Sequence, residues 1–357
     1  MNSAAESNRQ LPPEWAPHRA TWLAWPHNRE TWPNNLPDAQ EEFCLLANWI
    51  SKSEQACILA GKQFVDDVQR RFSGNPNVIV HLIETNDAWI RDYGPTFTLD
   101  RCRSSLQCVD WDYDAWGGKY PPFGDDQKVA KQISDLLGRP YAKVKRVIEG
   151  GAIEVNSNGT LLTTASCLLN QNRIGKESRD NVRREIERLF SEHLGATEVV
   201  WLSGAELAGD DTDGHIDQAL RFVDDRNLAI ASCQSVDDPQ AKSLSQMSRE
   251  VETWLGSSRA TIDLISLPLP NEVRVGGTRI PASYANFIFT NEHLIIPQFG
   301  DKLADEQAIE ILKERVCDRE VIGLPSANLT YGLGSFHCLT QQEPESADAI
   351  KNGRDLV

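Results

Sequence analysis

Residues 152–164 read AIEVNSNGTLLTT, and this stretch decides the fold class. Two short apolar runs, 152–155 and 160–164, flank the pair Asn158-Gly159, a combination typical of a β-hairpin. A helical pattern follows over residues 176–194 and closes at Gly195, before an apolar strand at 197–202. The segment therefore predicts one unit of strand, strand, helix and strand (ββαβ).

The same order of elements recurs with a period of about 60 to 70 residues. Further units are expected over residues 95–148, 218–267 and 284–324. Residues 20–60 supply a strand, a helix and a strand, and a lone strand at 335–340 would complete them as a fifth unit. Repeats that cannot bury their faces alone are expected to stack or close.

We therefore predict an α/β protein with one domain over residues 15–344, in which five ββαβ units surround a pseudo-fivefold axis. An ordinary open α/β sheet is the alternative. Residues 1–14, which are polar, are expected to form a disordered tail, and residues 345–357 a second tail.

The composition limits the classes of function. The 357 residues carry 36 Lys and Arg against 52 Asp and Glu, a formal net charge of −16. This balance disfavours nucleic acid as a partner and is compatible with a small cationic substrate. The 8 cysteines form no CxxC pair, which disfavours zinc. The sequence has no signal peptide and no long apolar run, so we expect a cytoplasmic protein without a membrane partner; homo-oligomerisation is left open.

One loop concentrates charge beyond all others. Residues 209–217 read GDDTDGHID and place four carboxylates and one imidazole directly before an apolar run. If a strand begins near His215, then His215 and Asp217 share one face, because side chains alternate along a strand. A carboxylate beside an imidazole suits a cationic substrate that exchanges protons. The alternative is an Asx-rich surface turn.

Other polar clusters fall at matching places in the repeat: NDAWIRDYGP at 86–95, EGG at 149–151 and GSFHCLTQQ at 334–342. Cys338, predicted on a strand beside a glycine-rich turn, is the candidate nucleophile, with His215 to take its proton. A buried structural cysteine is the alternative. His337, on the opposite strand face, is expected to pack or to support the site. Asp92 has an ion pair with Arg91 as its alternative.

Several motifs in this order resemble the family of bacterial agmatine deiminases and Porphyromonas-type peptidylarginine deiminases. They are NDAWIRDYGPTF, DAWGG, EGGAIEVNSNGTLLTT, CLLNQNR, DDTDGHID, PASYANF and GSFHCLTQQ, and they extend over nearly the whole chain. The resemblance implies the pentein fold, an α/β propeller of five ββαβ units, in agreement with the repeat described above.

The resemblance also implies roles for individual residues. It places the nucleophile on Cys338, the general acid and base on His215, and a supporting carboxylate on Glu149. The two guanidinium-binding carboxylates fall on Asp92 and Asp217. Trp89 would line the substrate channel, Asp213 matches an acidic position, and Trp116 of DAWGG lies near the site as a further substrate-binding residue.

The implied reaction is hydrolysis of agmatine to N-carbamoylputrescine and ammonia, with no cofactor and no metal. Two departures from the family pattern, LNQNRIG and YDAWGG, leave the substrate less defined. Peptidylarginine is the alternative substrate. An amidinotransferase and a non-catalytic pentein binding module are more distant alternatives.

Overall fold

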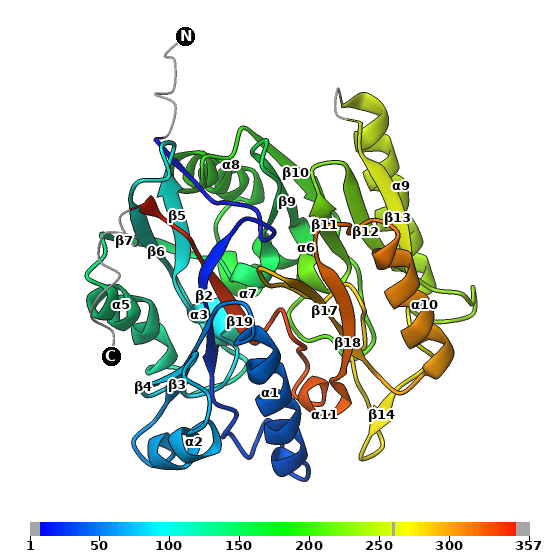
Figure 1. Cartoon of the computed structure of the whole chain (residues 1–357). Coiled ribbons are helices and arrows are strands. Elements are labelled where there is room, and N and C mark those ends of the chain that lie inside the picture. The colour runs from blue at the N-terminus through cyan, green and yellow to red at the C-terminus, as the bar shows by residue number, and fades with distance from the viewer. Residues whose placement is uncertain (1–7, 259–260, 348–357) are drawn as a thin grey trace.

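The computed structural model describes residues 8–258 and 261–347, which form a mixed α/β fold (Figure 1). Five sheets share one pattern, in which a central strand pairs antiparallel with one neighbour and parallel with the strand that follows a helix. The first contains β5 (Thr96–Asp100), β6 (Leu106–Asp112), α5 (Asp126–Leu137) and β7 (Tyr141–Val147). The second contains β8 (Glu154–Val155), β9 (Thr160–Thr164), α8 (Arg179–Leu189) and β10 (Glu198–Leu202).

The third sheet contains β11 (Leu220–Asp224), β12 (Asn227–Ser232) and β13 (Asp263–Pro268), with helix α9 (Ala241–Ser257). The fourth contains β16 (Ile288–Phe289), β17 (His293–Gln298) and β18 (Glu320–Pro325), with helix α10 (Lys302–Lys313). A separate hairpin, β14 (Arg274–Val275) and β15 (Thr278–Arg279), comes between these two sheets in the sequence and projects at the lower right in Figure 1.

The fifth sheet joins segments from both ends of the described chain. Strand β19 (Thr340–Pro344) pairs antiparallel with β2 (His18–Ala24), which pairs parallel with β3 (Gln55–Ala60) and, through it, with β4 (Val78–Leu82). Helix α1 (Leu36–Ile50) connects β2 to β3, and helix α2 (Val65–Arg71) connects β3 to β4. The strand predicted at 335–340 begins only at Thr340, because residues 336–339 form a turn closed by the bond from the Thr340 amide to the His337 carbonyl.

Amphipathic helices explain the layering. In α9 the buried positions include Leu244, Met247 and Val251, which recur at the spacing of one helix face. In Figure 1 the long helices α1, α5, α8, α9 and α10 lie at the periphery, and the strands lie nearer the centre. The first strands of several units are short. The expected strand 284–290 reduces to Ile288–Phe289, and 152–155 reduces to Glu154–Val155 after the 3-10 turn η1 (Gly150–Ala152).

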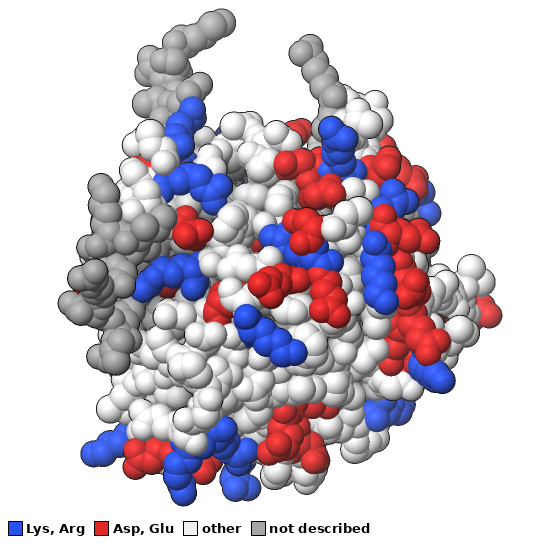
Figure 2. All heavy atoms as spheres, viewed as in Figure 1, with Lys and Arg blue, Asp and Glu red and all other residues white. Residues whose placement is uncertain are grey.

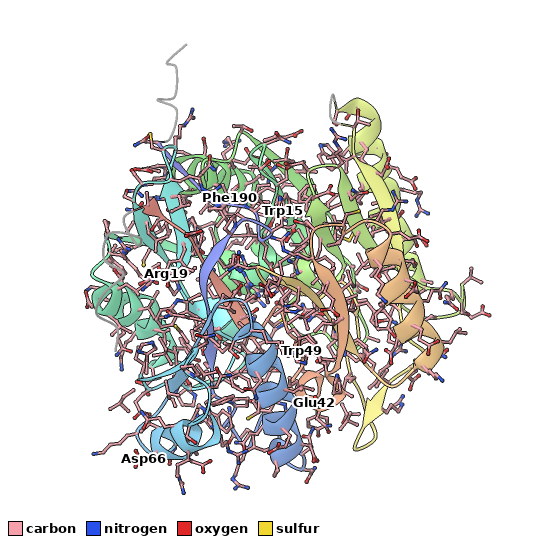
Figure 3. The ribbon with its side chains drawn as sticks, viewed as in Figure 1. Trp15, Arg19, Glu42, Trp49, Asp66 and Phe190 are labelled. Carbon is pink, nitrogen blue, oxygen red and sulfur yellow. The ribbon has the colours of Figure 1, made fainter. Side chains whose placement is uncertain are left out.

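The expected N-terminal tail over residues 1–14 is wrong for its second half. Strand β1 (Arg9–Gln10) pairs with β5, and the side chain of Glu14 is buried. Trp15 (Figure 3) makes edge-to-face contacts with Phe222 and Phe289 of two different sheets. Residues 1–7 lie outside the described residues. After β19, the amide of Glu345 still bonds to the carbonyl of Pro17.

The surface carries mixed charge. On the face shown in Figure 2, acidic side chains gather toward the right, over α9 and α10, with Lys and Arg among them. A search of the described residues for a helix with the length and apolar character of a membrane span finds none.

Candidate active site

A cavity of about 930 Å³ opens at the loops between the sheets. Its lining includes four of the predicted site residues, Trp89, Asp92, Trp116 and Cys338. His215, Asp217 and Glu149 are buried behind this lining. The loops that the sequence analysis selected therefore do converge, although they come from positions up to about 250 residues apart in the chain.

Cys338 lies in the turn that precedes β19, not on a strand as predicted. Its Sγ atom is 3.3 Å from Asn286 Nδ2, 3.8 Å from Gln218 Nε2 and 3.6 Å from Asp217 Oδ2. Burial raises the pKa of the Cys338 thiol well above its usual range, and the charges of Asp217 and Asp92 raise it further. The thiol is therefore protonated at rest and needs a cation nearby before it ionises.

Gly151 marks the point at which the charged groups meet. A Cβ atom on this glycine would lie 2.5 Å from His215 Nδ1 and 3.1 Å from both Asp92 Oδ1 and Asp217 Oδ2. Both carboxylates and the imidazole thus surround one small space, which only a residue without a side chain leaves open. This contact explains the second glycine of the EGG motif.

Asp217 is carried by the 3-10 turn η3 (Ile216–Gln218), where the sequence analysis expected a strand. Its Oδ2 accepts a hydrogen bond of 2.7 Å from His337 Nδ1. Its Oδ1 is buried and has no hydrogen-bond partner among the described residues. Although burial alone would raise it, the pKa of Asp217 is lowered, because the hydrogen bond and charge of His337 and the charges of His215 and Arg221 favour the ionised form.

Asp92 lies on the short helix α3 (Ile90–Tyr93). Its Oδ1 accepts from the amide of Gly151 at 2.9 Å, and its Oδ2 accepts from the indole of Trp116 at 3.0 Å. Burial raises the pKa of Asp92; His215 opposes this shift, and Asp217 and Glu149 add to it. The alternative ion pair with Arg91 is not found in the described part of the chain, where Arg91 donates to the His337 carbonyl and to Gln342.

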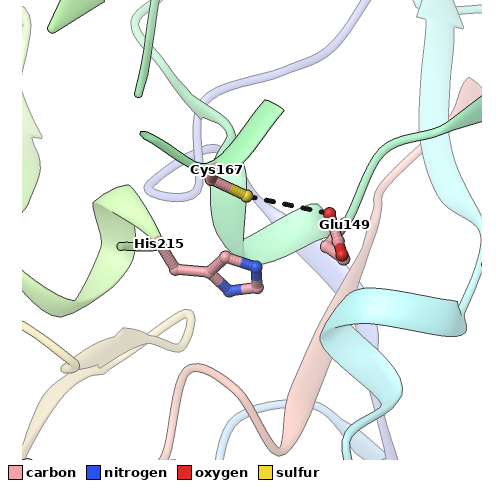
Figure 4. Close-up of side chains that lie close together, drawn as sticks. All are labelled: Glu149, Cys167 and His215. Atoms are coloured by element: carbon pink, nitrogen blue, oxygen red, sulfur yellow. Dashed lines mark hydrogen bonds between the residues drawn. The ribbon is translucent and has the colours of Figure 1, made fainter. Parts of the chain in front are cut away.

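His215 immediately precedes η3 and is buried, and neither ring nitrogen has a hydrogen-bond partner within the described ranges. Its Nδ1 lies 3.8 Å from Asp92 Oδ1. Figure 4 shows its ring facing Glu149 and Cys167. Both ring nitrogens are therefore available for hydrogen bonds to a bound molecule.

Glu149 is held by Arg173, whose Nε donates to Glu149 Oε1 at 2.8 Å, and by the Cys167 thiol, whose Sγ is 3.8 Å from Oε2. Arg173 also donates to Asp213 Oδ2 at 2.6 Å. Lys119 is 3.0 Å from the same Asp213 oxygen. Asp213 is absent from the cavity lining, and its bonds to Arg173 and Lys119 fix the loop that carries it.

The two tryptophans predicted in the site make different contacts. Trp89 lines the cavity and packs on Trp32 with 5.4 Å between ring centroids. Trp116 also lines the cavity, but its indole is committed to Asp92. Its backbone φ of +58° lies in the left-handed region that non-glycine residues rarely adopt. The DAWGG motif therefore encodes a strained turn that presents one hydrogen-bond donor to a site carboxylate.

Comparison with known proteins decides the family. The model of the Porphyromonas-type peptidyl-arginine deiminase family matches residues 10–344. The chain belongs to this family. The resemblance predicted from the motifs is thereby confirmed.

Other members of the Porphyromonas-type peptidyl-arginine deiminase family match over nearly their whole length. The agmatine deiminase of Stutzerimonas stutzeri (strain A1501) is 34% identical, over 94% of this chain and 95% of that protein. A substrate-bound serine variant of the C. jejuni agmatine deiminase superposes with a TM-score of 0.86 at 27% identity, covering 97% of this chain and 99% of that one. The agmatine deiminase of Enterococcus faecalis gives a TM-score of 0.85 at 27% identity, covering 96% and 99%.

Three polar residues of this family member were missed in the sequence analysis. Asn286 and Gln218 direct amide groups at the Cys338 sulfur, and Arg173 holds Glu149. Each lies in or directly after a motif that the sequence analysis quoted, PASYANF, DGHID and CLLNQNR. The motifs were thus the available signal, but nothing in the local pattern told these side chains from packing residues.

Metal-ligating side chains come together once in the described ranges. Ligand atoms of Glu149, Cys167 and His215 lie within 4.8 Å of one another (Figure 4). The Arg173 guanidinium already neutralises Glu149, and a metal ion beside it would be repelled. The cluster therefore suits proton exchange better than metal binding. The expectation that the family chemistry needs no metal or cofactor stays a prediction.

Proposed function

We propose that this chain hydrolyses agmatine to N-carbamoylputrescine and ammonia through a covalent thiouronium on Cys338. Membership of the family makes the chain a hydrolase of guanidino carbon–nitrogen bonds. The observation that carries the proposal is the convergence of two buried carboxylates and an imidazole around Gly151, beside the Cys338 thiol.

Binding begins with charge. The guanidinium enters the space between Asp92 and Asp217, and the free Oδ1 of Asp217 accepts from it. This bound cation offsets the two negative charges that keep the thiol protonated, so binding itself promotes ionisation of Cys338. The amides of Asn286 and Gln218 stabilise the resulting thiolate.

Proton transfers pass through His215. The thiol proton moves to His215, and the sulfur attacks the guanidinium carbon to form a neutral tetrahedral adduct. His215 then protonates one amino group, which leaves as ammonia and yields a cationic thiouronium. In the second half, His215 takes a proton from water and the hydroxide attacks. The neutral adduct collapses to the ureido product as its hydroxyl proton passes to the departing sulfur, and His215 gives its proton to solvent, where the released ammonia takes it up.

The cavity lining favours a dication over a zwitterion. It includes the carboxylates Glu30, Asp87, Asp92, Asp126 and Asp211, whereas Arg29 is the one Lys or Arg in the lining formed by the described residues. The distal ammonium of agmatine therefore meets acidic groups, and the α-carboxylate of free arginine does not find a pair of arginines. Peptidylarginine is the second candidate, because a cavity of about 930 Å³ has room for a larger substrate.

The architecture that goes with this function is a single domain over residues 15–344, with the five sheets arranged around a pseudo-fivefold axis. The repeated strand order and the pairing of β19 with β2 support this arrangement.

The test is a comparison of substrates, with ammonia and ureido product measured for agmatine, free arginine and a blocked arginyl peptide. Cys338→Ser should abolish turnover, while Cys108→Ser, at a buried position in β6 outside the site, should retain it. We expect kcat/KM for agmatine to exceed that for arginine by about 100-fold, equivalent to about 2.7 kcal/mol. The gap should narrow in 1 M salt, where the Debye length falls to about 3 Å.

Two other outcomes of the substrate comparison would contradict parts of the proposal. Equal turnover of agmatine and arginine, or preference for the peptide, would reject agmatine and keep the deiminase chemistry. A folded protein that forms no ureido product from any of the three would instead favour a non-catalytic binding module.

A further inference from the structure

His337 bridges two carboxylates that lie far apart in the sequence. Its Nδ1 is 2.7 Å from Asp217 Oδ2 in the site, and its Nε2 is 2.9 Å from Glu14 Oε2 in the N-terminal segment. The His337 side chain is 2% exposed, so water does not substitute for either partner. The mechanism above assigns no step to His337 or to Glu14.

The geometry fixes how many protons the ring carries. An ionised carboxylate only accepts hydrogen bonds, and a neutral imidazole has one donor and one acceptor. With a carboxylate at each nitrogen, both nitrogens must donate, which makes the ring an imidazolium. Both carboxylates are ionised. Despite the opposing effect of burial, the charges of Arg221 and His337 hold the pKa of Glu14 well below its usual range, and the pKa of Asp217 is lowered as well.

Charged groups from several elements surround His337. Three of them are carboxylates: Glu14 and Asp217 of η3, and Glu154 of β8, whose pKa is raised by burial. Arg221 of β11 donates to both Glu14 and Glu154 and supplies one positive charge. Arg91 of α3, bonded to the His337 carbonyl, supplies the second. Protonated His337 is the third, and the neutral Cys338 thiol adds no charge at rest.

We propose that Glu14 and His337 are positioning residues, which keep Asp217 ionised and occupy its Oδ2 so that Oδ1 is left for the guanidinium of the substrate. This inference rests on the proposed function for the identity of that substrate. It gives the N-terminal segment a part in substrate binding, because Glu14 is fixed there by the amide of Phe289 at 2.9 Å and by Arg221.

The chain offers a matched control. His18 and Glu54 form a second buried imidazole–carboxylate pair, with 3.1 Å between Nδ1 and Oε1. Its contact with Glu14 is from His18 Nε2 to the backbone carbonyl, at 2.6 Å, and not to the Glu14 carboxylate. Glu14→Gln and Glu54→Gln therefore remove the same charge from equivalent burial. Loss of stability is expected from both, but only Glu14→Gln should alter catalysis.

The experiment uses the full chain and two readouts. For Glu14→Gln, steady-state assays with agmatine should give a KM raised about tenfold, equivalent to about 1.4 kcal/mol, with a smaller change in kcat. The variant should also show a pH profile of kcat/KM that differs from wild type, because His337 then has one carboxylate partner instead of two. Glu54→Gln should keep the wild-type KM and the wild-type pH profile.

Nitrogen NMR of histidine-labelled protein tests the arrangement of Glu14, His337 and Asp217 without an activity assay. In wild type at pH 8, both ring nitrogens of His337 should carry hydrogens, with the signals assigned by their loss in His337→Gln. A neutral His337 in wild type, or Glu14→Gln with unchanged KM and pH profile, would overturn the proposal. If wild-type protein shows the imidazolium but does not turn over agmatine, the proposed function is rejected. The inference about Glu14 and His337 then still stands.

Discussion

Asp92 and Asp217 are the same residue type, lie around the same glycine and are both buried, yet the protein treats their charges in opposite ways. Asp217 is bonded to His337 and lies near Arg221, and its pKa is lowered. Asp92 accepts from two neutral donors, the amide of Gly151 and the indole of Trp116, and its pKa is raised.

The difference shows how a site can hold two carboxylates for one cation. If both were left without positive partners, their mutual repulsion in a buried space would force one to keep its proton. If both were paired with protein cations, neither would attract the substrate. Here the charge of Asp217 is balanced by the protein in advance, and that of Asp92 is left for the substrate to balance.

The largest effect is expected from Asp217→Asn. It removes a charge-assisted bond to the guanidinium, which is worth about 1.5–3 kcal/mol, so kcat/KM should fall by up to about 150-fold. It also leaves His337 and Arg221 without a buried counter-charge, which should lower the free energy of unfolding by about 3 kcal/mol. Denaturant unfolding and steady-state kinetics measure both. An unchanged stability would contradict the pairing described for Asp217.

Asp92→Asn should damage activity to a somewhat smaller degree, by about 30- to 100-fold in kcat/KM, through loss of a similar bond to the substrate. Its stability should stay equal to wild type or rise, because the replaced charge has no cationic partner closer than His215 at 3.8 Å among the described residues. In one melting experiment, Asp217→Asn should therefore lower the Tm, and Asp92→Asn should leave it unchanged or raise it. Equal losses of stability in the two variants would contradict the difference described between the two carboxylates.

Trp116→Phe should have a modest effect, because it removes only the indole donor from Asp92 Oδ2 and keeps an aromatic ring in the cavity wall. A neutral hydrogen bond is worth about 1 kcal/mol, so we expect kcat/KM to fall about fivefold. Trp111→Phe is the matched control, since its indole donates to Thr96 Oγ1 at 3.0 Å outside the site. Similar losses of activity in both variants would remove the special role of Trp116.

The smallest effect concerns pH and stability. A raised folded-state pKa means that folded Asp92 binds its proton more tightly than the unfolded chain, so ionisation destabilises the fold as pH rises from about 3.9 through the folded pKa. Asp92→Asn removes this loss, and its Tm relative to wild type should be higher by a few degrees at pH 7 than at pH 4. The pKa of Asp217 is shifted in the opposite direction. Ionised Asp217 therefore stabilises the fold, and this contribution is lost as pH falls through its lowered pKa. A Tm difference for Asp92→Asn that is the same at both pH values would contradict this assignment.

Local pattern was sufficient for most of the backbone. Strands β3 and β9 have the predicted bounds, and the five central strands were all anticipated, because apolar alternation and turn residues are local signals. The wrongly predicted strands lie in two segments that carry site residues. Residues 215–218 and 335–339 turn instead of extending, which places Asp217 and Cys338 beside each other.

The site residues were recoverable to the extent that motifs carry them, but their partners were not. Glu14 was assigned to a disordered tail, although it is buried against Arg221 and His337, more than 200 and 300 residues away in sequence. Asp213 was predicted as a substrate-binding residue, but its ion-pair partners Arg173 and Lys119 were not foreseen. Long-range pairing of this kind leaves no periodicity in the chain, and only the folded structure contains it.

The pairing of β19 with β2 also has a consequence during biosynthesis. The strand that follows Cys338 is translated after every other described strand, and its partner β2 is among the earliest to leave the ribosome. Strand β2 must therefore wait, bound to β3 on one edge and open on the other, until nearly the whole chain has been made. The same late event covers that edge and brings Cys338 to the cavity. Under the proposed function a nascent or prematurely terminated chain is therefore inactive, and it exposes an unpaired strand edge that chaperones can recognise.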